Sequence, residues 1–263
     1  MIPRIIHYCW FGRNPLPELA QKCIASWKKF LPDYEIKEWN EDNFDVNIIP
    51  YTKEAYSAGK YAFVSDYARF WILYKYGGLY FDTDVEVIRP MTDIIARGPF
   101  MGCENKAEGE NTPPRQLGVA PGLGLGSIPG LDIYQEFLDL YSTLHFATSD
   151  GALNTMSIVE YTTKIFVAHG LKNTLEIQQI AGVYIYPKEY FCPKDYHTEK
   201  LELTANTVAI HHYVGSWLAP EERLGNKLEN EFRQILHRLG IKPVGNWSWI
   251  IWHLSRKFAH IIK

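Results

Sequence analysis

The feature that most constrains the fold is an alternation of short apolar runs with longer helical patterns over residues 4–88. Runs rich in β-branched and aromatic residues predict strands, and apolar residues spaced three or four apart predict helices. On these criteria we predict strands at 4–10, 34–40 and 79–88, and helices at 18–32 and 60–78. Strands that alternate with helices in this way indicate an α/β fold with a mainly parallel central sheet flanked by helices.

The remainder of the chain is less regular. Residues 98–130 are rich in glycine, and we predict that 118–127 form a flexible loop. Helical patterns return at 131–144 and 154–170, and two late strands are predicted within 182–191 and 206–214. Because neither an internal repeat nor a linker is evident, we expect one main domain over 1–220, followed by a helical, basic and aromatic extension over 221–263.

Composition excludes several classes of protein. The formal net charge is −3, so no basic field argues for a nucleic-acid partner. The four cysteines are scattered without a CxxC pair, which argues against a zinc site or a disulfide framework. The N-terminus does not have the pattern of a signal peptide, and no uncharged apolar run is long enough to span a membrane. We therefore expect a cytoplasmic protein.

Two aspartates, Asp82 and Asp84, interrupt the apolar run that follows Gly77 and Gly78. On a strand, side chains two residues apart point to the same face, so both carboxylates could bind one ion. Carboxylates without nearby cysteine or histidine suit a hard cation, Mg²⁺ or Mn²⁺. Because magnesium takes few protein carboxylates and fills its shell with water and phosphate oxygens, the pair indicates a ligand that carries a diphosphate.

Other interpretations of the two aspartates remain open. The simplest is a half-exposed strand with an acidic face. A phosphotransferase of the haloacid-dehalogenase type would use Asp82 as its nucleophile, but Glu86 stands where that motif has Thr or Val. An EF-hand would need a longer acidic loop that ends in Glu. A module that binds a sugar nucleotide or a metal without catalysis is a further alternative.

Asp66 and Arg69 stand three residues apart on the helix predicted just before this strand. They could form only an intrahelical ion pair, which contributes a few tenths of a kcal/mol. Their apolar neighbours, however, predict a largely buried helix, where a charged pair needs additional partners. An Arg that faces a phosphate and an Asp that faces a ribose hydroxyl would provide such partners.

Three segments together carry a family resemblance: IPRIIHYCWFG near the N-terminus, SDYARFWILYKYGGLYFDTDVEV over 65–87, and IHHYVGSW over 210–217. In this order they resemble the DXD-containing sugar transferases of glycosyltransferase family 32, which include bacterial capsular-polysaccharide and fungal mannosyl transferases. More distantly, the spacing is similar to that of the large clostridial glucosylating toxins. The resemblance is densest over 2–92 and returns at 183–219. It implies a GT-A-type fold that binds a nucleotide-sugar donor, with UDP or GDP as its nucleotide.

The resemblance also implies roles for individual residues of the donor site. Trp10 would stack on the nucleobase beside the Cys9 backbone, a contact worth about 1–3 kcal/mol for aromatic rings on bases. Asp66 would hold the ribose, Arg69 a sugar hydroxyl or phosphate, and Tyr80 the diphosphate. Ser216 and Trp217 would close over the phosphates as part of a mobile loop.

The same resemblance assigns the metal site. Asp82 would contact the ribose and the Mn²⁺ or Mg²⁺ ion, Asp84 would be its firmest ligand, and His211 would lie near it. His212 is the alternative to His211, because neighbouring residues of an extended segment face opposite ways. Asp82, Asp84 and Arg69 are thus the catalytic candidates, and the flexible loop predicted at 118–127 would lie on the acceptor side.

The activity implied is transfer of a sugar, with retention of configuration, to a saccharide acceptor that could be linked to a lipid, during assembly of a surface polysaccharide. No residue stands out as a covalent nucleophile. From Arg233 to the C-terminus the chain has basic but no acidic residues, and three tryptophans lie within 247–252. This mixture favours either a peripheral contact with an anionic membrane or a helix packed on the domain.

Overall fold

The structure is a computed structural model that describes residues 1–104, 117–148, 152–195 and 200–215, together with a few helical positions between 224 and 235. The chain divides into two compact units. The first comprises Met1–Pro193 and Glu202–His212, and the second comprises Lys194–Leu201 and Tyr213–Lys263. The predicted domain boundary at 220 lies outside the described residues. None of the described helices is long and apolar enough to cross a membrane.

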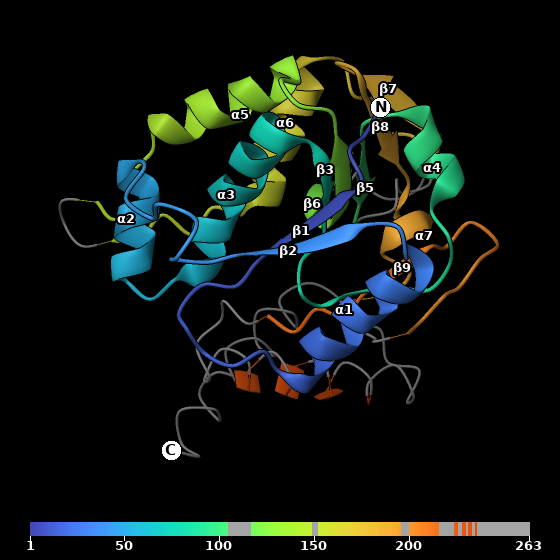
Figure 1. Ribbon diagram of the computed structural model, residues 1–263, viewed down its shortest axis with the longest axis horizontal. Coiled ribbons are helices and arrows are strands. Elements are labelled where there is room, and N and C mark those ends of the chain that lie inside the picture. The colour runs from blue at the N-terminus through green and yellow to red at the C-terminus, as the bar shows by residue number, and fades with distance from the viewer. Residues whose placement is uncertain are drawn as a thin grey trace. The chain divides into compact units, whose positions relative to one another are not determined.

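A seven-stranded sheet forms the centre of the first unit, in the order β2-β1-β3-β6-β5-β8-β7 (Figure 1). The strands are β1 (Ile5–Cys9), β2 (Glu35–Trp39), β3 (Gly78–Tyr80), β5 (Phe100–Cys103), β6 (Val119–Ser127), β7 (Gln178–Ile180) and β8 (Val183–Tyr186). β1 pairs in parallel with β2 and β3, and β5 with β8. The other three pairs are antiparallel. The predicted α/β class is confirmed, and its sheet is mixed.

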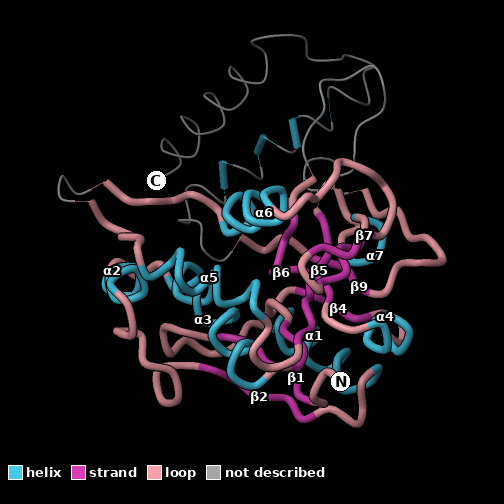
Figure 2. The backbone as a smooth tube through the Cα atoms, turned by 90° about the horizontal axis from the view of Figure 1, so that it is seen from above, coloured by secondary structure: helices cyan, strands magenta, loops and turns pink. Residues whose placement is uncertain are grey.

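Helices cover both faces of this sheet. They are α1 (Glu18–Phe30), α2 (Pro50–Ser57), α3 (Tyr61–Tyr76), α4 (Thr92–Arg97), α5 (Asp132–Ser142), α6 (Ile158–Ala168) and α7 (Lys188–Phe191). α3 packs on β1 and α5 on one side, whereas α1 packs on the other side, as Figures 1 and 2 show. The rings of Phe70 and Phe137 stack at 4.1 Å between α3 and α5. This aromatic core fixes α3, the helix that carries Asp66 and Arg69.

The close approach of α3 to the sheet depends on its C-terminal glycines. Gly77 and Gly78 have φ angles of 62° and 99°, which L residues rarely adopt. A Cβ at Gly78 would also lie 2.6 Å from the Ile5 carbonyl oxygen. Glycine therefore lets the chain leave the helix and pair with β1 within two residues.

The strand predicted at 79–88 is in fact two short strands. β3 ends at Tyr80, and β4 (Val85–Val87) pairs with β9 (Ala209–His211) in a separate two-stranded antiparallel sheet. Asp82, Thr83 and Asp84 form the turn between them. The prediction of one continuous strand over 79–88 was therefore wrong. The chain leaves the seven-stranded sheet after β3 and enters the two-stranded sheet at β4. β9 brings His211 opposite Val85, the residue directly after this turn.

The prediction of a flexible loop over 118–127 was also wrong. This segment contains β6, a central strand in which eight of nine residues are buried. Its glycines allow close packing: a Cβ at Gly126 would overlap the ring of Phe100, and Gly124 has a φ of 133° and faces Phe81. High glycine content here reflects tight contact with aromatic rings rather than mobility. The two late strands are shorter than expected, at 183–186 and 209–211.

Candidate active site

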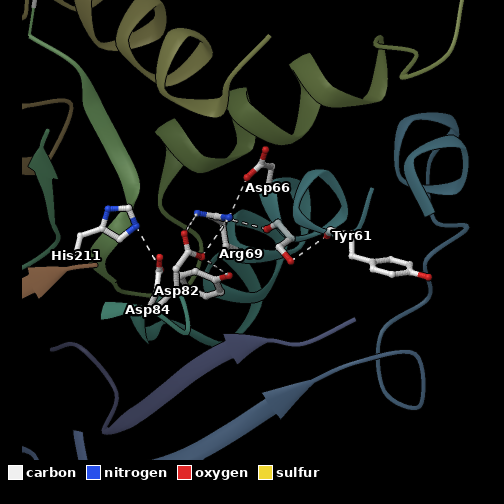
Figure 3. A network of polar contacts seen from close by, with 8 residues as sticks. Tyr61, Asp66, Arg69, Asp82, Asp84 and His211 are labelled. Carbon is white, nitrogen blue, oxygen red and sulfur yellow. Dashed lines mark hydrogen bonds and ion pairs between the residues drawn. The ribbon is translucent and has the colours of Figure 1, made fainter. Parts of the chain in front are cut away.

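Arg69 is the centre of the candidate site (Figure 3). Its side chain is 4% exposed, and its Nη2 donates a 2.9 Å hydrogen bond to Oδ1 of Asp66, one turn earlier on α3. Its Nη1 and Nη2 lie 3.4 Å from Oδ2 and Oδ1 of Asp82, and its Nε donates to the backbone carbonyl of Ser65. Asp66 and Asp82 are thus brought together by one buried guanidinium. The burial of Arg69 and Asp66 agrees with the sequence prediction, but the contact with Asp82 was not part of it.

Tyr80, the last residue of β3, completes this cluster. Its hydroxyl donates a 3.1 Å hydrogen bond to Oδ1 of Asp82. The guanidinium carbon of Arg69 lies 4.9 Å from the centre of the Tyr80 ring, which places a cation over an aromatic face. Tyr80 is 1% exposed, so its side chain contacts protein groups rather than solvent. It therefore holds the two charged groups in place from inside the fold.

The two aspartates project from the turn between β3 and β4. The Asp82 N–H donates to the Gly122 carbonyl at 3.2 Å, and the Val85 N–H donates to the Asp82 carbonyl at 3.0 Å. The expected basis for their convergence, alternation along a strand, is incorrect. The turn itself brings Asp82 toward Arg69 and Asp84 toward β9 (Figure 3).

His211 and His212 face opposite ways, as predicted. Nε2 of His211 lies 3.3 Å from Oδ1 of Asp84. His212 uses its backbone N–H to bind the Asp84 carbonyl, while its Nε2 donates to Glu86 at 2.9 Å. Glu86 also binds Lys22 of α1 at 3.2 Å. The imidazole beside the acidic turn is therefore that of His211.

Burial shifts the ionisation of the central groups. Desolvation raises the pKa of Asp66 to about 7 and also raises the pKa of Asp82, although the Arg69 charge acts against both shifts. Burial alone would lower the pKa of His211, but the neighbouring Asp84 carboxylate raises it well above its usual value. The pKa of Arg69 is raised by Asp82, Tyr80 and Asp66 against the effect of burial, so it stays charged.

The acidic turn fits a divalent cation that is shared with a ligand. Among the described residues, no group of three or more His, Cys, Asp or Glu side chains is arranged to hold a metal ion. Asp82 and Asp84 nevertheless offer carboxylate oxygens, the donors that Mg²⁺ and Mn²⁺ prefer. Mg²⁺ is commonly held by one or two carboxylates, with water and substrate phosphates completing its shell. The donor set suits such an open site better than a closed protein cage.

The nucleobase candidates lie where β1 ends. Cys9 is buried at the end of that strand, and burial raises the pKa of its thiol to about 12, so the side chain stays neutral. Trp10 is half-buried. Its backbone N–H donates to the Trp39 carbonyl, and its Nε1 donates to the Asn14 carbonyl at 2.6 Å. The indole is thus held at the carboxyl end of a parallel strand, where ligands of open α/β sheets commonly bind. Ser216 and Trp217 lie outside the described residues.

Sequence reasoning missed two residues that shape the turn. Trp27 of α1 is fully buried, and its Nε1 donates to the Val85 carbonyl at 2.8 Å. Gly122 of β6 accepts the Asp82 N–H and packs against the Asp82 side chain. The glycine-rich run PGLGLGS was the available signal for Gly122, but its contact with Asp82 depends on the sheet order.

Residues 17–101 match the family described as "Glycosyltransferase sugar-binding region containing DXD motif". This segment belongs to that family. It contains Asp66, Arg69, Tyr80, Asp82 and Asp84, and so the whole Arg69 cluster and the acidic turn. The family expected from the motifs is confirmed.

Two curated proteins of Schizosaccharomyces pombe are similar to part of the chain. Inositol phosphoceramide mannosyltransferase 1 is 32% identical over 111 residues, which cover 38% of this chain and 33% of that protein. Inositol phosphoceramide mannosyltransferase 3 is 34% identical over 98 residues, which cover 36% of this chain and 27% of that protein. The chain thus spans about a third or less of the length of these relatives.

Solved glycosyltransferase structures also match at low identity. The PaToxG glycosyltransferase is 18% identical with a TM-score of 0.41, over 53% of this chain and 60% of that chain. A glycosyltransferase involved in glycosylation of the major capsid of PBCV-1 is 13% identical with a TM-score of 0.46, over 89% of this chain and 100% of that chain.

Proposed function

We propose that this protein is a metal-dependent glycosyltransferase that moves a sugar from a nucleoside diphosphate sugar to a hydroxyl of a saccharide acceptor. The observation that carries the proposal is the position of Arg69, which lies buried between Asp66 and Asp82 beside a turn that presents a second carboxylate, Asp84. The family of residues 17–101 supports it, because that family is defined by its sugar-binding region and DXD motif.

The main chemical requirement of such a reaction is that the negative charge on the leaving diphosphate be neutralised. A divalent cation held by Asp82 and Asp84 supplies Lewis-acid neutralisation of that charge when bound. Arg69 contributes a fixed positive charge that needs no reorganisation, because Asp66, Asp82 and the Ser65 carbonyl already orient its guanidinium. Asp66 provides a buried carboxylate oxygen that can accept a hydroxyl of the ribose or of the transferred sugar.

The remaining candidates orient the donor. Nε2 of His211 lies 3.3 Å from Oδ1 of Asp84, which is turned toward it in Figure 3, so His211 can orient that carboxylate. Trp10, fixed by its hydrogen bond to Asn14, offers an indole face on which a nucleobase can stack. Tyr80 supports the diphosphate indirectly, since its hydroxyl and ring restrain Asp82 and Arg69.

The donor and acceptor are finer parts of this proposal. The curated relatives are named as mannosyltransferases, so GDP-mannose is the first donor to test, followed by UDP-hexoses. The acceptor is a saccharide, including one linked to a lipid, in assembly of a surface polysaccharide. We also propose retention of configuration, with attack of the acceptor from the face of the leaving diphosphate. NMR assignment of the anomeric proton in the product tests this, and an inverted product contradicts it.

Thermal unfolding with a panel of GDP-mannose, UDP-glucose and UDP-galactose, each with Mn²⁺, tests donor binding. We expect one donor to raise the Tm of the wild type, and Asp84→Ala to lose that shift. Asp33→Ala, which removes an exposed carboxylate paired with Arg4 at 3.9 Å, is the matched control and should respond like the wild type. A wild type that no donor stabilises, or an Asp84→Ala variant that responds normally, contradicts the proposal.

Product analysis separates the proposal from its alternatives. A glycosyltransferase releases the nucleoside diphosphate in proportion to sugar transferred, and slowly in the absence of acceptor. A phosphotransferase that uses Asp82 would hydrolyse p-nitrophenyl phosphate without any sugar acceptor. A binding module would show the Tm shift but neither transfer nor donor hydrolysis.

A further inference from the structure

Strand β6 approaches the acidic turn at one residue, Gly122. It is the one position of β6 that is not buried, since all eight other residues of the strand are. Its carbonyl accepts the hydrogen bond from the Asp82 N–H at 3.2 Å. At this point, therefore, the surface beside the Asp82 carboxylate is formed by bare backbone.

The pairing register between β5 and β6 shifts where β6 approaches Asp82. Met101 of β5 pairs with Leu125 of β6, but the next residue, Gly102, pairs with Ala120. Residues 121–124 of β6 therefore have no partner in β5. On the other side, Tyr80 of β3 also pairs with Leu125, and Gly122 instead meets the chain beyond β3. Irregular pairing of this kind, as in a β-bulge, bends a strand locally, and β-bulges are common next to functional sites.

The space at Gly122 is occupied by the site itself. A Cβ built at this position would overlap Oδ2 of Asp82 and would lie 3.3 Å from its Cγ and 3.4 Å from Nη1 of Arg69. Gly122 is not among the glycines with positive φ, unlike Gly124 at 133°. Its backbone conformation is therefore open to other residues, and the need for glycine at 122 is one of space.

We propose that Gly122 is a positioning residue for the donor site. Because glycine has no side chain, the Asp82 carboxylate can turn toward Arg69, and this sets the orientation in which Asp82 contacts the ligand. This inference rests on the proposed function, because the ligand it concerns is the nucleotide with its metal ion. A methyl group at 122 would force the carboxylate to rotate, and its contacts with Arg69 and Tyr80 would lengthen together. Asp82, the proposed metal ligand, and Arg69, the cation proposed to face the phosphate, would then both be displaced.

Gly122→Ala tests the inference, with Gly126→Ala as the matched control. Both substitutions add one methyl to β6 at a glycine without positive φ, and both meet a side chain. At 126 that side chain is Phe100, a core residue of β5, whereas at 122 it is Asp82. The control therefore reproduces the crowding of the strand without touching the carboxylate.

The measurement is calorimetric titration of each folded variant with GDP and with UDP in the presence of Mn²⁺, at a temperature well below its Tm. We expect Gly122→Ala to bind the preferred nucleotide with Mn²⁺ roughly 10- to 100-fold more weakly, the range typical when the surroundings that orient a metal ligand are altered. Gly126→Ala should bind within about twofold of the wild type, whatever its Tm.

A double-mutant cycle then shows whether Gly122 acts through Asp82. In an Asp82→Ala background the carboxylate is gone, so Gly122→Ala should weaken nucleotide binding by less than about twofold, and its effect on Tm should shrink as well. Additive losses, or wild-type binding by Gly122→Ala, overturn the inference and leave the proposed function intact. A wild type that binds neither nucleotide with Mn²⁺ overturns the proposed function and the inference together.

Discussion

The indole Nε1 of Trp27 donates a 2.8 Å hydrogen bond to the backbone carbonyl of Val85, the first residue after the acidic turn. Ser26, its neighbour on α1, accepts the N–H of Val87 at 2.9 Å. Helix α1 thus holds both ends of β4 from outside the site. The ring of Trp27 also packs on Tyr8 and Phe81, at 5.8 and 5.4 Å between ring centres. Trp27, a fully buried residue of α1, therefore helps to fix the backbone directly after Asp84.

Trp27→Phe should loosen this support. The variant keeps an aromatic ring but leaves the buried Val85 carbonyl without its donor, which costs about 1–3 kcal/mol of unfolding free energy. Because the turn loses an anchor, we expect weaker nucleotide binding as well. Urea unfolding and nucleotide titration with Mn²⁺ measure the two effects. Trp71→Phe, a similar change at a half-buried Trp of α3, should leave nucleotide affinity unchanged. Equal affinity in wild type and Trp27→Phe would show that α1 supports only stability.

Arg69→Lys should be severe although the charge is kept. Lysine cannot reproduce the forked contacts of the guanidinium with Asp66, Asp82 and the Ser65 carbonyl. We expect a loss of about 2–4 kcal/mol in unfolding free energy, because buried carboxylates lose partners, and at least about 100-fold in activity. Urea unfolding and initial rates with a confirmed donor measure these losses. Arg4→Lys, at an exposed pair of 3.9 Å with Asp33, is the control and should cost less than about 0.5 kcal/mol.

Some helices and strands could be predicted from the sequence, and others could not. The helix at 60–78 and the first two strands were located to within a few residues, because α3 combines a long apolar pattern with a glycine end and β1 and β2 have strand composition. β6 was missed, since its glycines match a loop in composition and only the neighbouring Phe100, Phe81 and Asp82 show why they are needed. Tertiary contact overrides local propensity in such a strand.

In the site, too, some contacts could be predicted from sequence and others could not. Asp66 and Arg69 could be paired from their spacing on one helix, and Asp82 and Asp84 from their proximity in sequence. The contact of His211 with Asp84 joins residues 127 positions apart and depends on the pairing of β4 with β9. No local pattern encodes that pairing, so only a resemblance to known sequences could suggest it.

His7 gives the fold a dependence on pH that is separate from the site. It is buried, its Nδ1 accepts the Nε1–H of Trp39 at 3.0 Å, and its Nε2–H donates to the Gly77 carbonyl at 3.0 Å. Burial lowers its pKa from 6.5 to about 4. Between these values the unfolded chain binds a proton that the folded one does not, so stability falls as pH decreases through this window, by about 3 kcal/mol in total.

His7→Gln should flatten this dependence. The neutral amide cannot take up the proton, so the part of the acid sensitivity that comes from His7 disappears, even though the variant is less stable near neutral pH. Urea unfolding at several pH values from about 4 to about 7 gives the slope that linkage relates to proton uptake. His169→Gln, at an exposed histidine paired with Glu136, should keep the wild-type slope. An unchanged slope in His7→Gln would contradict the assignment.

His211, the last residue of β9, and His212, which follows it, should differ in function. His211 contacts Asp84 through its side chain, whereas the imidazole of His212 binds Glu86. Groups that orient a metal-binding carboxylate commonly change affinity by about 10- to 100-fold when removed. We therefore expect His211→Gln to weaken Mn²⁺-dependent nucleotide binding by at least about tenfold and His212→Gln by less than about twofold. Titration of both variants with GDP or UDP and Mn²⁺ compares them, and circular dichroism checks that each is folded. The reverse order of effects would assign the role to His212, and equal small effects would remove both residues from the site.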